Sequence, residues 1–84
     1  MSPEAQWSLN TFKSLQEGGG WAVPRSGLIF RKRGDTMVLT NVMPHAADMP
    51  ITAKQLREQQ QSELRVITRY FGEAGIEVIA RCEI

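Results

Sequence analysis

The chain has one cysteine and one histidine among its 84 residues. A single cysteine cannot form an internal disulfide, and together with one histidine it does not make a set of metal ligands. We therefore expect no disulfide framework, no metal site and no other cofactor. The scarcity of cysteine also favours a reducing, cytoplasmic location.

Long apolar runs are absent as well. No segment approaches the ~20 apolar residues that a helix needs to cross a bilayer. The start of the sequence, Met1 to Gln6, lacks the basic and apolar regions of a secretory signal. We expect a protein that is neither exported by a standard signal nor inserted in a membrane.

The sequence has almost no excess of one charge. Ten Lys and Arg residues against nine Asp and Glu residues give a formal net charge of +1, so global electrostatics neither demands nor excludes an anionic partner. Hydrophobic residues make up 42% of the chain, which is ordinary for a globular domain. Residues 1–84 should form a single domain, and any basic patch on it must be local.

The chain is also short. At this size folding hides only roughly 60 to 65% of the surface of the extended chain, so the stability margin should be thin. Self-association would add buried area, and we therefore expect a homodimer.

Signatures of catalysis are missing. Gly18–Gly20 follow a predicted helix, whereas glycines that cradle a phosphate precede one, and no Gly-Lys-Ser or Gly-Lys-Thr occurs. His45 has Asp48 three residues on, and Ser26 is a conceivable nucleophile, but no pattern brings these three together. Cys82 alternates with inward-facing residues and should be a small buried side chain. We expect no enzymatic activity.

The strongest positive signal is a hairpin. Two strand-like segments, 28–33 and 36–42, flank Gly34-Asp35, a pair typical of two-residue hairpin turns. This turn predicts an antiparallel register that runs from Arg33 opposite Thr36 to Ile29 opposite Thr40. Because side chains alternate along a strand, one face is apolar and the other is mixed and basic. The predicted inner face holds Leu28, Phe30, Met37 and Leu39, and the outer face holds Ile29, Arg31, Arg33, Thr36, Val38 and Thr40.

Helices are predicted on both sides of the hairpin. The first begins at Ser2 and ends before Gly18–Gly20, with Ala5, Leu9, Phe12 and Leu15 on its apolar side. The second begins at Thr52, where Gln55 completes a capping box, and ends at Gly75. Its buried stripe should hold Leu56, Leu64, Ile67, Phe71 and Ala74, interrupted by Gln60 and Glu63.

Residues 76–84 alternate between apolar and polar and predict a third strand. The expected fold is a small two-layer α+β domain in the order α-β-β-α-β, with two helices on one face of a three-stranded sheet. The order of the strands in the sheet stays open. Residues 21–27 contain Pro24 and should form an irregular lead-in or a short edge strand, or else fold over the outer face of the sheet.

Apolar residues on the predicted outer face favour protein association. Interfaces concentrate Trp and Arg, and apolar side chains amid Arg and Thr fit that composition. The candidate interface residues are Trp7, Trp21, Ile29, Val38 and Ile79.

Two basic clusters suggest a nucleic-acid alternative, because such clusters can neutralise phosphates. The first holds Arg25, Arg31 and Arg33 with Lys32 at its edge, and the second holds Lys54, Arg57, Arg65 and Arg69 on the second helix. No aromatic residue alternates onto the outer sheet face for base stacking.

These patterns together predict a small non-catalytic protein-interaction or accessory module. It is expected to be homodimeric through the outer sheet face or through the polar half of the second helix. The alternative is a nucleic-acid-binding accessory protein that uses the two basic clusters.

Overall fold

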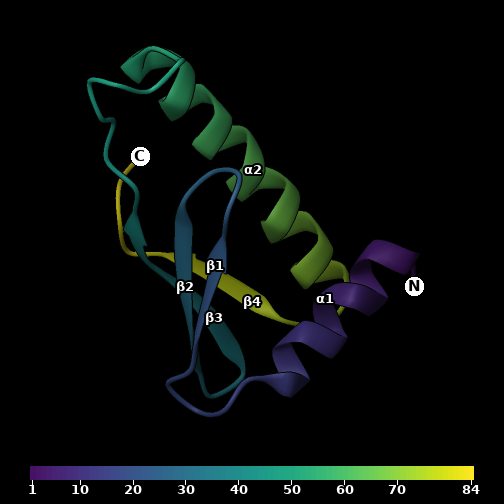
Figure 1. The fold of residues 1–84 in the computed structure, drawn as a ribbon. Helices are drawn as coiled ribbons and strands as arrows, with labels where there is room; N and C mark the ends of the chain where they lie inside the picture. Colours follow the sequence, from purple (N-terminus) through teal and green to yellow (C-terminus); the bar gives the residue numbers. More distant parts are fainter.

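A computed structural model describes residues 1–84 and has two helices on one face of a four-stranded sheet (Figure 1). The predicted small α+β fold is confirmed, with one strand more than expected. The elements are α1 (Pro3–Ser14), β1 (Gly20–Val23), β2 (Leu28–Arg33), β3 (Thr36–Val42), α2 (Ala53–Glu73) and β4 (Glu77–Ala80).

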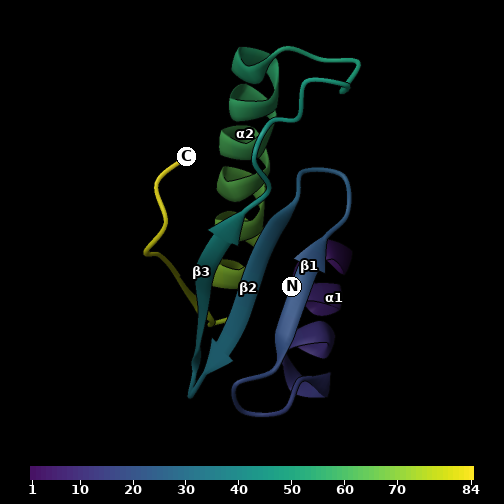
Figure 2. The same cartoon turned by 60° about the vertical axis from the view of Figure 1, so that its left-hand side comes forward.

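The strands lie in the order β1-β2-β3-β4. β1 pairs antiparallel with β2, β2 pairs antiparallel with β3, and β4 is parallel to β3. α2 is therefore the crossover between two neighbouring parallel strands. The extra strand β1 includes the start of the segment 21–27, for which the sequence left several possibilities. It forms an edge of the sheet instead of folding over its outer face (Figure 2).

The hairpin follows the predicted register over most of its length, from Arg33 opposite Thr36 to Phe30 opposite Leu39. Beyond that point the prediction is wrong, because a bulge pairs Ile29 with Asn41 instead of Thr40. The extra residue of the bulge is Thr40, and its hydroxyl donates to the Ile29 carbonyl at 3.3 Å. The predicted inner face is confirmed, since Leu28, Phe30, Met37 and Leu39 are all 0% exposed.

α1 begins as predicted, with the Ser2 hydroxyl accepting a hydrogen bond from the Ala5 amide at 3.1 Å. Lys32 of the neighbouring hairpin stabilises the C-terminal end of α1, because its ammonium group donates to the carbonyls of Phe12 and Leu15 at 3.3 and 3.1 Å. Ala5 and Phe12 are buried on its inner side, and Leu9 and Leu15 are partly buried.

The capping box of α2 is confirmed in both directions. The Gln55 amide donates to the Thr52 hydroxyl at 3.1 Å, and the Thr52 amide donates to the Gln55 side chain at 2.9 Å. Ala74 caps the other end, and Gly75 follows it at φ +84°. The buried stripe holds Leu56, Gln60, Ile67 and Phe71, with Leu64 and Ala74 partly buried.

β4 is shorter than predicted, since it covers only Glu77–Ala80 of the alternating segment. After one further bond, from the Arg81 amide to the Leu39 carbonyl, the chain leaves β3, and the Ile84 carbonyl accepts a bond from Gln61 of α2. The predicted inward side held Ile76, Val78, Ala80, Cys82 and Ile84. Ile76 is buried, and Val78, Cys82 and Ile84 pack against the core, whereas Ala80 is exposed.

Candidate binding groove

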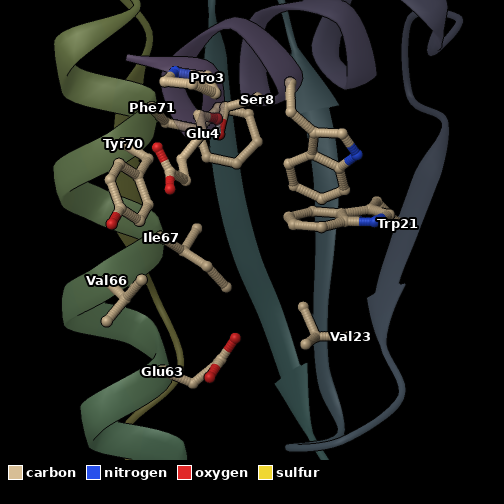
Figure 3. A pocket seen from close by; sticks show the side chains of 11 residues that line it. Pro3, Glu4, Ser8, Trp21, Val23, Glu63, Val66, Ile67, Tyr70 and Phe71 are labelled. Atoms are coloured by element: carbon tan, nitrogen blue, oxygen red, sulfur yellow. Dashed lines mark hydrogen bonds between the residues drawn. The ribbon is translucent and has the colours of Figure 1, made fainter.

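An apolar groove of about 420 Å³ lies between α1, α2 and β1 (Figure 3). The two helices form its walls, and the inward side chains of the edge strand form its floor. It is lined by Pro3, Glu4, Trp7 and Ser8 of α1, by Trp21 and Val23 of β1, and by Glu63, Val66, Ile67, Tyr70 and Phe71 of α2.

The groove exists because the two helices differ in length. α1 has 12 residues and α2 has 21, which correspond to about 18 and 32 Å at 1.5 Å per residue. The N-terminus of α1 is fixed beside the C-terminal end of α2, where the Ser2 amide donates to the Glu73 carboxylate at 3.2 Å. The short helix therefore cannot cover the middle of α2, and the side of α2 toward β1 stays open.

Aromatic packing holds the floor and one wall in place. The Trp21 ring stacks on Phe30 with centroids 5.5 Å apart and also contacts Phe71 at 5.6 Å. Trp7 meets Trp21 edge to face, with centroids 5.6 Å apart and planes at 61°. Trp7 is nevertheless 55% exposed. The ring is thus positioned by its neighbour while much of its apolar surface remains in water.

α2 contributes a second apolar row beside its buried stripe. Val66 and Tyr70 are four residues apart and therefore lie one above the other on the helix surface. Tyr70 is half-buried, while Val66 is 43% exposed. A large exposed apolar side chain on each wall, facing the same groove, is unusual for a surface that touches only water.

The charged residues of the groove are both acidic. Glu4 and Glu63 line it, no Lys or Arg does, and Figure 3 shows both carboxylates pointing into the space between the helices and β1. No hydrogen bond within the chain engages either carboxylate. The groove therefore combines aromatic faces with negative charge, an environment that favours a cation.

The predicted interface residues divide between the two faces of the sheet. Trp7 and Trp21 lie in the groove, whereas Ile29, Val38 and Ile79 lie on the face that carries no helix. Val38 is opposite Ile79 on β4 but is only 3% exposed, and Ile29 and Ile79 are half-buried. The outer face therefore offers less free apolar surface than the sequence suggested.

The predicted basic residues are all exposed, but they lie on opposite layers. Arg31 and Arg33 project from the outer face of β2, where the Arg31 guanidinium donates to the Gly18 carbonyl at 3.0 Å. Lys32 points the other way, onto the Phe12 ring at 4.5 Å. The remaining members are Arg25 in the turn after β1 and Lys54, Arg57, Arg65 and Arg69 along α2.

The residues considered for catalysis make no hydrogen bond to one another. The His45 ring nitrogen Nε2 lies 2.7 Å from the Ile51 carbonyl. Ser26 is completely buried in the turn between β1 and β2, and its hydroxyl has no hydrogen-bond partner. Cys82 is a free, half-buried thiol.

Of the eleven residues that line the groove, sequence reasoning named only Trp7 and Trp21 as candidate site residues, and it missed the roles of Glu4, Glu63, Val66 and Tyr70. The available signal was Val66 and Tyr70, a pair of apolar residues at helical spacing outside the predicted stripe. The sequence marked Glu63 only as an interruption of the buried stripe and gave no signal for Glu4, because the importance of both depends on the placement of α1 against α2.

No protein-family model, no curated protein and no solved structure matches this chain. Neither helix has an apolar stretch of the length and hydropathy that would span a membrane. The groove and the charged surfaces are therefore the basis for assigning a function.

Proposed function

We propose that this protein is a non-catalytic protein-interaction module that binds a polypeptide segment in the groove between α1, α2 and β1. The observation that carries the proposal is the pair of exposed apolar side chains over the groove, Trp7 at 55% and Val66 at 43%. We also keep the expected reducing, cytoplasmic setting as part of the proposal.

The exposed surface is large enough to drive binding. A Trp side chain buries about 150 to 250 Å² in full, so covering the exposed half of Trp7 removes about 100 Å² from water. At about 25 cal/mol per Å² this contributes about 2.5 kcal/mol before the cost of ordering the partner. Since Trp21 already positions the ring, little side-chain entropy is lost when a partner covers it.

The groove chemistry selects the partner. Two unpartnered carboxylates, Glu4 and Glu63, line the same groove as the rings of Trp7, Trp21 and Tyr70. A Lys or Arg side chain satisfies both features, because it pairs with a carboxylate and is attracted to an aromatic face. The partner segment should therefore present apolar residues and at least one basic residue. A phosphate backbone would be repelled from this groove.

Peptide display tests the proposal. A random peptide library is selected on the natural protein and counter-selected on Val66→Lys, which places a positive charge in the groove and repels a basic partner. Enriched peptides should carry a Lys or Arg near an aromatic or aliphatic residue, and they should bind Trp7→Ala and Val66→Lys at least ten-fold more weakly. Thr68→Lys is the matched control, because Thr68 is exposed on the same helix but does not line the groove.

The proposal fails if no peptide is enriched, or if enriched peptides bind the two groove variants as tightly as the natural protein. Peptides that lack a basic residue yet depend on Val66 would contradict the role given to Glu4 and Glu63.

The second part of the proposal is self-association through the outer sheet face. Ile29 and Ile79 supply half-exposed apolar surface on either side of buried Val38. A dimer on this face leaves the groove free, because the groove lies in the helix layer. Absolute mass by light scattering measures this part independently of peptide binding.

Nucleic-acid binding is the alternative, and the observation in its favour is that all seven predicted basic side chains are exposed. The two clusters face opposite sides, so a single duplex could contact only one of them. Fluorescence anisotropy with labelled DNA and RNA at low and near-physiological salt separates the hypotheses. Tight binding that weakens steeply with salt would support the alternative, and replacing Arg31 and Arg33, or Arg65 and Arg69, would identify the cluster.

A further inference from the structure

We infer that the partner segment binds in extended form, as a fifth strand paired with β1, and projects every second side chain into the groove. This inference rests on the proposed function and specifies the mode of binding. The segment belongs to another protein, and binding of a second copy of this chain is an alternative outcome of the test.

The hydrogen bonds at the start of β1 establish which backbone groups are free. The Gly18 amide donates to the Lys32 carbonyl at 2.8 Å, and the Lys32 amide donates to the Gly19 carbonyl at 3.0 Å. Gly19 is thus bonded to β2, and the pattern alternates along an antiparallel strand. At the far end the Gly27 amide donates to the Val23 carbonyl at 2.7 Å, in the same phase. Trp21 and Val23 therefore direct their backbone groups toward β2.

Gly20 and Ala22 have the opposite phase, so their amides and carbonyls point away from the sheet. β1 is an edge strand, and nothing in the sheet pairs with that side. These two residues offer two donors and two acceptors to an incoming strand.

Apart from its short length, the β1 edge lacks the features that usually prevent pairing. Edge strands are often protected by charged side chains or proline. The two outward-bonding residues of β1 are Gly20 and Ala22, both small and uncharged, and Pro24 lies beyond the strand. The opposite edge differs, since β4 begins with Glu77 and is followed directly by Arg81. β1 is short, which limits non-specific pairing but accommodates a specific segment.

The edge and the groove form one continuous surface. The side chains of Trp21 and Val23 point from β1 into the groove. A strand paired with β1 lies about 4.8 Å away and directs alternate side chains to the same face. One of them falls beside Trp21 and Trp7, and the next, about 7 Å further along, falls beside Val23, toward which the Glu63 side chain points from α2 (Figure 3). Backbone bonding would then supply affinity, and the groove would select the side chains.

The sequences of the peptides enriched by display would distinguish an extended from a helical mode of binding. A strand should show its apolar and basic requirements at alternate positions, i and i+2. A helix lying in the groove would show them at i, i+3 or i+4, and that spacing would overturn the inference.

Amide exchange tests the mode directly. Hydrogen–deuterium exchange is measured by NMR on the full chain, free and saturated with a selected peptide. The Gly20 and Ala22 amides should exchange at least ten-fold more slowly in the complex. If the peptide binds in a Val66-dependent manner and neither amide is slowed, the strand mode is wrong while the proposed function stands. If no peptide depends on the groove, the proposed function itself is wrong.

A substitution provides the second test. Ala22→Pro removes the outward donor without removing a bond to β2, and it should weaken peptide binding at least ten-fold. Ala22→Ser keeps the amide and should bind within about two-fold of the natural protein. Peptide binding that is unchanged in folded Ala22→Pro would overturn the inference, and the exchange measurement decides if this variant does not fold. Protection of Gly20 and Ala22 in the free protein, rising with concentration and accompanied by a dimeric mass, would instead assign the edge to a second copy and overturn the assignment to a foreign segment.

Discussion

At the scale of single residues, Gln60 has the most demanding position in the chain. It lies in the buried stripe of α2 and is only 4% exposed. Its amide nitrogen donates to the carbonyls of Ser26 at 3.1 Å and Met43 at 2.9 Å. These carbonyls belong to the turn before β2 and to the loop after β3, so one side chain joins both to the helix. Gln60, which interrupts the apolar stripe in the sequence, therefore uses both N–H groups of its side-chain amide as hydrogen-bond donors.

Replacing Gln60 with Leu should lower the free energy of unfolding by about 2 to 3 kcal/mol, because the buried Ser26 carbonyl and the partly buried Met43 carbonyl would both lose their partner. Chemical denaturation monitored by tryptophan fluorescence measures the change. Gln61→Leu is the control, since Gln61 is exposed and its single bond, to Ile84, is 3.4 Å long. Equal stability of the two variants would show that the Gln60 bonds contribute little.

Single residues also show where sequence reasoning reaches its limit. Ser2, Thr52 and Gln55 were assigned correctly, because a capping interaction depends on residues three positions apart. The buried, unpartnered hydroxyl of Ser26 and the low exposure of Val38 were not foreseen. Burial of these two depends on neighbours that are distant in the sequence.

At the scale of elements, the glycines between α1 and β1 do more than end the helix. The Gly19 amide donates to the Gln16 carbonyl at 2.7 Å, which closes a four-residue turn with Gly18 at φ +77°. A positive φ at the third position is the mark of a type II turn. The same glycine opens a bulge opposite Lys32, and the bulge sets the phase of β1. The free edge used in our inference is thus determined at Gly18.

Replacing Gly18 with Ala should lower the free energy of unfolding by about 1 kcal/mol, because an L-residue resists this backbone conformation even though nothing lies within 4 Å of the added methyl group. Gly72→Ala should act in the opposite direction and stabilise by about 0.5 kcal/mol, since Gly72 lies in α2 with open space around it. Thermal unfolding of both variants tests the pair. An unchanged stability of Gly18→Ala would show that the type II turn does not depend on glycine at this position.

The elements also differ in how well they could be predicted. The hairpin and both helix starts follow from local patterns, and they were correct apart from the bulge at Thr40. β1 was left open because Pro24 and the short segment weaken its strand signal. The groove was not foreseen although the unequal helix lengths and Trp7 and Trp21 were, because it depends on the contact of Ser2 with Glu73 that places α1 beside one end of α2.

At the scale of the whole molecule, the outer sheet face has a charge pattern that suits a two-fold dimer. Arg33, Thr36 and Glu77 form one row across β2, β3 and β4, and Arg31, Val38 and Ile79 form the next. A two-fold axis parallel to β3, between two sheets packed face to face, places β2 of one copy over β4 of the other. Arg33 of each copy then lies opposite Glu77 of its partner, and Ile79 lies opposite Arg31.

Charge exchange tests this arrangement. Glu77→Arg should weaken the dimer, because it sets two basic residues opposite each other, and the double variant Arg33→Glu with Glu77→Arg should restore it. Absolute mass by light scattering over a concentration series gives the readout, with Ile29→Asp and Ile79→Asp expected to break the dimer as well. Val66→Lys should leave the mass unchanged, since the groove lies in the other layer. A monomeric mass for the natural protein at every concentration would refute self-association. If the natural protein is a dimer and the Glu77→Arg, Ile29→Asp and Ile79→Asp variants are dimers as well, the interface does not lie on the outer face. Peptide binding by the monomeric variants would then show that the groove works in a single copy of the chain.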